Sequence, residues 1–192
     1  MSKQREVLPT VLTMIIAQAP DAAIYLSGSV ALGNERPDSD LDIYAIVPDV
    51  KAVNYPGGTM ETDEEGYKAF SAEYEGVSLE IRFLTPSFFE GHLQNRPWRG
   101  YKVPLKSEIL SDPYGFLQSW KDRVSPWFRD HPEAVALWEQ WITEYSECRR
   151  TKGEKQGELI RRFPYMVPHF WPHLDNLYSG EQTNEQQPKR SD

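Results

Sequence analysis

The chain has 192 residues, 39% of them hydrophobic, which is enough for one domain, or for one domain and a small accessory unit, around a buried core. Its formal net charge of −8 argues against the basic face that proteins use to bind long nucleic acid. A single cysteine, Cys148, excludes an internal disulfide, and no apolar run reaches membrane-spanning length, so we expect a cytoplasmic protein.

The first quarter of the chain alternates helix and strand patterns. Apolar residues at helical spacing predict an amphipathic helix over residues 5–18. A buried strand over residues 22–26 then leads into a turn at Gly28-Ser29, and a short helix follows over residues 30–32. The alternating run at residues 41–47 predicts a second strand with a buried face.

Two carboxylates stand at the start of this second strand. Asp40 and Asp42 alternate with apolar residues, and residues two apart on a strand point to the same side, so both carboxylates share one face. Without a Lys or Arg beside them, two such anions repel each other, and a fold tolerates this mainly when a divalent cation lies between them. A metal site that faces the Gly28-Ser29 turn, which suits phosphate, predicts phosphoryl or nucleotidyl transfer.

A third acid follows on a predicted hairpin. Residues 68–74 and 77–84 are the expected strands, joined by a turn at Glu75-Gly76, and the polar, acidic segment 48–66 before them is expected to be a mobile loop. Glu80 lies in the second strand of the hairpin. Because neighbouring strands are about 4.8 Å apart, its carboxylate can reach the same metal cluster as the two aspartates. Three carboxylates around two metal ions are the arrangement that two-metal phosphoryl transfer requires.

The second half of the chain has a mainly helical pattern. A helix is expected to start over residues 86–93, an edge strand over residues 108–110, and Asp112 is expected to cap a helix that runs to about Val124. Residues 132–151 predict a strong amphipathic helix. The proline- and aromatic-rich segment 163–173 fits a packed extended segment better than a partner-binding surface.

The order and spacing of the acids resemble the polymerase-beta-like nucleotidyltransferase superfamily, in particular its minimal and aminoglycoside-type members. The resemblance rests on the runs Gly28-Ser29-Val30-Ala31-Leu32-Gly33, Asp38-Ser39-Asp40-Leu41-Asp42-Ile43 and Leu79-Glu80-Ile81. Together with the expected elements it implies an α+β nucleotidyltransferase fold. Its mixed, mostly antiparallel sheet would have four or five strands and helices on one face, and a small helical region would follow. Where many minimal members carry Arg, this chain has Val30-Ala31-Leu32, and Arg36 is the candidate for the missing positive charge.

The resemblance also implies a role for each site residue. Gly28 would let the backbone approach the triphosphate, and Ser29 would offer its hydroxyl and amide to the outer phosphates. Asp40 and Asp42 would each bind Mg²⁺ or Mn²⁺. Glu80 would bind the metal near the attacking hydroxyl, where it is also a candidate general base. The nucleotide substrate is an NTP, for which we expect ATP.

These inferences predict a catalytic domain over residues 1–110, a helical acceptor-side region over residues 111–180 and a disordered tail over residues 181–192. The favoured function is metal-dependent transfer of NMP from an NTP to a hydroxyl of a small-molecule acceptor. The alternatives are a toxin–antitoxin-type enzyme that modifies a protein or tRNA, and an inactive nucleotide-binding module. We expect neither long nucleic acid nor membrane as a partner, whereas a homodimer or a helical protein partner stays open.

Overall fold

The computed structural model describes residues 1–94, 106–133, 135, 136, 139, 140 and 143 of the chain. The helix predicted over residues 132–151 lies mostly outside this part of the chain. The segment 163–173 and the tail over residues 181–192 lie wholly outside it. Within the described part, no helix is long and apolar enough to cross a membrane.

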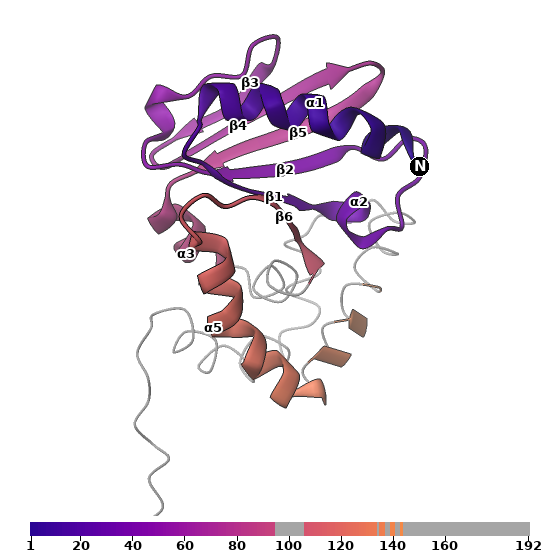
Figure 1. Ribbon diagram of the computed structural model, residues 1–192, viewed down its shortest axis with the longest axis vertical. Helices are drawn as coiled ribbons and strands as arrows, with labels where there is room; N and C mark the ends of the chain where they lie inside the picture. Colours follow the sequence, from indigo (N-terminus) through magenta and orange to yellow (C-terminus); the bar gives the residue numbers. More distant parts are fainter. Residues whose placement is uncertain (95–105, 134, 137–138, 141–142, 144–192) are drawn as a thin grey trace, which may run out of the picture.

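The strands form one six-stranded sheet in the order β3-β4-β5-β2-β1-β6 (Figure 1). Along the chain the elements are α1 (Lys3–Gln18), β1 (Ala23–Ser27), α2 (Gly28–Leu32), β2 (Leu41–Ile46), the 3-10 helix η1 (Val50–Ala52), β3 (Thr59–Glu64), β4 (Tyr67–Tyr74), β5 (Val77–Leu84), α3 (Pro86–Gln94), β6 (Glu108–Ser111) and α5 (Phe116–Asp130). Strands β2 and β5 are parallel, and the other neighbouring pairs are antiparallel. The predicted α+β class, the mixed, mostly antiparallel sheet and the β4–β5 hairpin are therefore confirmed.

The sheet has one strand more than expected, because part of the segment predicted to be a mobile loop is strand β3. Its sequence, Thr59 to Glu64, is polar and mostly exposed, so it lacks the alternation of buried apolar residues that identifies a strand. Backbone pairing with β4 holds it at the edge of the sheet. The acidic side chains also suit an edge, where charge discourages pairing with another chain.

Helices cover both faces of the sheet, not one face as predicted. Along β2, Leu41, Ile43 and Ala45 point into an apolar cluster with α1. The alternate residues Tyr44 and Ile46 point into a second cluster with α3 and α5. Figure 1 shows α1 along one side of the sheet, with α3 and α5 on the other. A strand that is buried on both faces reads as a nearly continuous apolar run, which is the pattern of residues 43–47.

Helix α5 begins later than predicted. Its N-cap is Gly115, which has a left-handed backbone conformation with φ of 69°, and its first residue is Phe116. Asp112 lies three residues before this N-cap, but its Oδ2 still accepts a hydrogen bond at 2.8 Å from the backbone N–H of Gln118, in the first turn of the helix. The buried face of the helix, which includes Trp120 and Val124, packs on the second cluster and so places α5 on one face of the sheet.

Candidate active site

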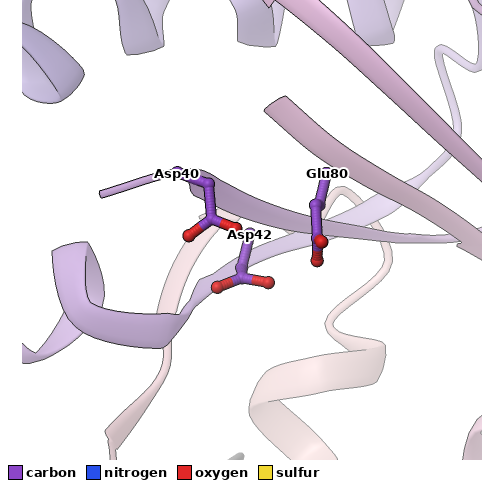
Figure 2. Close-up of side chains that lie close together, drawn as sticks. All are labelled: Asp40, Asp42 and Glu80. Carbon is purple, nitrogen blue, oxygen red and sulfur yellow. The ribbon is translucent and has the colours of Figure 1, made fainter. Parts of the chain in front are cut away.

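The three predicted acids meet at the paired ends of two parallel strands. Asp40 immediately precedes β2, Asp42 is the second residue of β2, and Glu80 lies on β5. The parallel register pairs Asp42 directly with Glu80. One carboxylate oxygen from each of the three acids lies within 4.8 Å of the others. Figure 2 shows the three carboxylates on the same side of the two strands.

The glycine turn lies directly against these acids. Gly28 follows β1, and its φ of 70° is in the left-handed region that favours glycine. A Cβ atom at this position would lie 2.1 Å from Oδ2 of Asp42, which is far inside van der Waals contact. Only glycine therefore fits here unless Asp42 moves. Because Ser27, the last residue of β1, is also paired with Asp42, β1 delivers Gly28 and Ser29 to the acid cluster.

A cation that the sequence analysis missed lies among the acids. Arg82 donates a hydrogen bond from Nη1 to Oδ1 of Asp42 at 2.9 Å, and its Nη2 contacts Oε2 of Glu80. Its Cζ lies 4.9 Å from the centre of the Tyr44 ring, a cation–π contact. The expectation that no Lys or Arg stands beside the aspartates is therefore wrong. Arg82 follows Glu80 by two residues on one strand, so its place on the same face was readable from the sequence.

Arg36, the predicted source of positive charge, lies elsewhere. Its guanidinium Nε is 3.5 Å from Oδ1 of Asp38, and both side chains are largely exposed to solvent. This is an ion pair within the loop that precedes Asp40, and exposed pairs of this kind contribute little to stability. Among the described residues, Arg82 is the basic side chain that contacts the acid cluster.

Burial and charge shift two ionisation equilibria in the site. Partial burial raises the pKa of Glu80 above its ordinary value; the charge of Arg82 opposes this shift, and the charges of Asp42 and Asp40 add to it. For Arg82, burial alone would lower the pKa, but Tyr44, Glu80 and Asp42 outweigh it and raise the pKa further. Arg82 therefore stays cationic at every physiological pH, whereas Glu80 holds a proton more readily than a solvated glutamate.

The donor set fits a hard divalent cation. Mg²⁺ and Mn²⁺ prefer carboxylate oxygens, and Mg²⁺ binds few of them because it keeps several waters and substrate phosphate oxygens. Arg82 contacts Oδ1 of Asp42, whereas Oδ2 of the same carboxylate lies toward Gly28. Asp40, Asp42 and Glu80 are all partly exposed, so an ion has access to them. Four formal charges, three negative and one positive, leave the cluster anionic enough to attract one.

Comparison with known proteins agrees with this geometry. Residues 9–103 match the family model of the nucleotidyltransferase domain. These residues form a nucleotidyltransferase domain of the polymerase-beta-like superfamily. No curated protein matches the chain. The matched segment includes the glycine turn, the three acids and Arg82. It begins within α1 and leaves the first turn of that helix outside.

Proposed function

We propose that this nucleotidyltransferase is metal-dependent and moves NMP from an NTP, with ATP as the expected donor, to a hydroxyl of a small-molecule acceptor. The observation that carries the proposal is the convergence of Asp40, Asp42 and Glu80 within 4.8 Å of one another beside the Gly28 turn. A phosphate-compatible turn against a carboxylate cluster suits a nucleotide whose phosphates bridge the two.

Each residue has a distinct role in this proposal. Asp40, Asp42 and Glu80 hold Mg²⁺ or Mn²⁺, which when bound supplies positive charge for the attacking and leaving oxygens of an in-line displacement. Gly28 and Ser29 hold the outer phosphates. Glu80 accepts the proton of the attacking hydroxyl as the general base.

The acceptor side of the proposal rests on charge and on the position of α5. The net charge of −8 suits a cationic small molecule better than a polyanion. Helix α5 packs on the face of the sheet that carries Asp42 and Glu80, since Tyr44 and Leu84, on the same strands and face, belong to one apolar cluster with its buried residues. We retain as part of the proposal a catalytic domain over residues 1–110 and an acceptor-side region over residues 111–180, of which α5 packs directly on the sheet.

Binding of Mn²⁺ and a non-hydrolysable NTP tests the metal assignment. Asp40→Asn and Asp42→Asn should each weaken binding severely, because each removes an anionic ligand. Asp38→Asn is the matched control, since it makes the same change in the same loop on a residue paired with the exposed Arg36. If Asp40→Asn and Asp42→Asn bind as the unchanged protein does, the site is wrongly assigned.

A second experiment identifies the acceptor class. Labelled NTPs are incubated with pools of cationic hydroxylated small molecules, tRNA or protein, and products are read by mass shift. An NMP adduct on a small hydroxyl compound supports the proposal. An adduct on tRNA or protein selects the toxin–antitoxin-type alternative. Intact metal–nucleotide binding with no product in any pool selects the inactive nucleotide-binding module.

A further inference from the structure

The first turn of α1 lies outside the family-matched residues 9–103, yet it contacts the loop that delivers Asp40. Within it, Gln4 is 1% exposed and is the one buried polar side chain among the described residues. Its neighbours on the same helix face, Val7, Leu8 and Val11, belong to the apolar core. An amide in such surroundings is costly unless its hydrogen bonds are made.

The side-chain amide of Gln4 makes its hydrogen bonds to a single loop, residues 36–39. Its Nε2 donates to the backbone carbonyls of Ser39 at 2.8 Å, Arg36 at 3.0 Å and Pro37 at 3.3 Å. Two N–H groups thus serve three acceptors, and residues 36–39 curve around the amide. The Ser39 carbonyl belongs to the peptide unit that joins Ser39 to Asp40. Gln4 therefore holds the peptide that carries the first metal-binding aspartate.

Ser2 and Arg5, on either side of Gln4, bind three segments near the site: the loop before Asp40, α2 and β6. Ser2 Oγ donates to Oε1 of Glu35 at 2.6 Å. Arg5 Nη2 donates to the carbonyl of Val30, in α2, at 2.8 Å, and Arg5 Nη1 pairs with Oε2 of Glu108, in β6, at 2.5 Å. We call Ser2, Gln4 and Arg5 the N-terminal clamp. It connects α1 to α2, to the loop before Asp40 and to the edge strand.

We propose that Gln4 is a positioning residue for nucleotidyl transfer, which fixes the Asp40 carboxylate in the acid cluster through the Ser39–Asp40 peptide. This rests on the proposed function, because it takes Asp40 as a metal ligand. Metal ligands must be held close to their productive geometry, and loss of the groups that orient them typically costs about 10–100-fold in metal affinity. Of the three acids, Asp40 depends most on such a group, because it precedes β2 and its backbone is not paired with β5 as that of Asp42 is.

The test is Gln4→Met, which keeps the length of the side chain but removes the donor. Mn²⁺ affinity of the full chain is measured by electron paramagnetic resonance at a temperature where all variants are folded. Thermal unfolding is measured in parallel. The control is Val11→Ala, which opens a cavity in the same core and on the same helix, seven residues beyond Gln4. We expect Gln4→Met to weaken Mn²⁺ binding about 10–100-fold, and Val11→Ala to lower the melting temperature with unchanged affinity.

Two results would overturn the proposal: unchanged Mn²⁺ affinity in Gln4→Met, or an equal loss of affinity in Val11→Ala. Should Gln4→Met not fold, Gln4→Asn carries the same test, because its shorter side chain moves the amide away from Ser39. Asp40→Asn separates this proposal from the function on which it rests. If Asp40→Asn binds Mn²⁺ normally, the proposed metal site fails; if it binds weakly while Gln4 variants bind normally, only the role of Gln4 fails.

Discussion

The two faces of the central sheet differ in what they bury, although the same strands build both. The face under α1 is mainly aliphatic, with few rings, and Leu41, Ile43 and Ala45 of β2 are each 0% exposed. The face under α3 and α5 is aromatic, with Tyr25 and Tyr44 stacked at 4.8 Å between ring centres. The acid cluster and Arg82 lie at one end of the second face. The comparison shows that the same strands place most of the aliphatic packing on one face and the reactive groups on the other.

Aromatic contacts link the charged end of the second face to its core. Arg82 lies over the Tyr44 ring, Tyr44 stacks on Tyr25, and Tyr25 meets the edge of Phe89 at 6.0 Å. Phe89 contacts Trp120 of α5 at 5.2 Å. Rings of this kind have few rotatable bonds and defined packing geometry, so they form a rigid support for the guanidinium. Cavities among the aliphatic side chains should therefore affect stability, and changes at the charged end should affect ligand binding and catalysis.

The largest expected effect is that of Glu80→Gln on turnover. General-base assistance is typically worth about 10²–10⁴-fold, and the amide removes the base while keeping the shape of the side chain. Nucleotide affinity should change far less, because Gly28, Ser29, Asp40 and Asp42 are still present. Steady-state kinetics and nucleotide titration measure the two quantities. Glu73→Gln, on the neighbouring strand β4 and exposed, is the control. Full activity in Glu80→Gln would leave Glu80 as an ordinary strand residue.

The opposite behaviour is expected of Ile43→Ala. This substitution leaves a cavity under α1 and should lower the free energy of unfolding by about 2–5 kcal/mol. Mn²⁺ affinity of the folded protein should stay unchanged, since Ile43 points away from the acids. Urea unfolding gives the first quantity and Mn²⁺ titration the second. A fall in affinity that parallels the fall in stability would mean that the two faces are not separable.

A smaller effect is expected of Arg82→Met, and it should depend on metal. Without metal, the variant leaves Asp42 and Glu80 without their cation and should lose about 1–3 kcal/mol of unfolding free energy. The expected loss is small for a salt bridge because the Glu80 side chain is 45% exposed, so solvent screens its interaction with Arg82. With saturating Mn²⁺ the difference from the unchanged protein should shrink, because the ion supplies the missing positive charge. Equal losses with and without Mn²⁺ would show that Arg82 and metal do not serve the same carboxylates.

The smallest expected effect is a pH dependence from Glu80 in the metal-free protein. The pKa of Glu80 is raised in the folded state, mainly by burial, so the folded protein holds this proton at pH values where the unfolded chain has released it. Stability from this group is therefore fully present below the ordinary glutamate pKa of 4.5 and is lost as pH rises through the folded pKa. The difference in unfolding free energy between the unchanged protein and Glu80→Gln, followed across this window in EDTA, measures it. Relative to Glu80→Gln, the unchanged protein should lose unfolding free energy as pH rises through this window, and a relative gain would contradict a raised pKa.

The acid cluster was predictable because strand alternation alone puts Asp40 and Asp42 on one face and Glu80 on a neighbouring strand. The position of Arg82 was only partly predictable from the sequence. Its face follows from Glu80, but its reach to Asp42 depends on the parallel pairing of β2 with β5. Gln4 had no sequence signal, because its three acceptors are backbone carbonyls 32 to 35 residues away. Side chains that bind main-chain atoms of a distant loop leave no pattern in spacing or composition.

The place where α1 begins has a practical consequence for anyone who shortens this protein. A version trimmed on its N-terminal side to the family-matched segment would start at residue 9 and would keep every residue of the acid cluster. It would also keep most of the apolar face of α1, including Val11 and Ile15. The hydrogen bonds from Ser2, Gln4 and Arg5 would be gone. The boundary drawn by family likeness and the boundary drawn by hydrogen bonding thus differ by one or two helical turns, and the second is the one to respect when a functional unit is cut out.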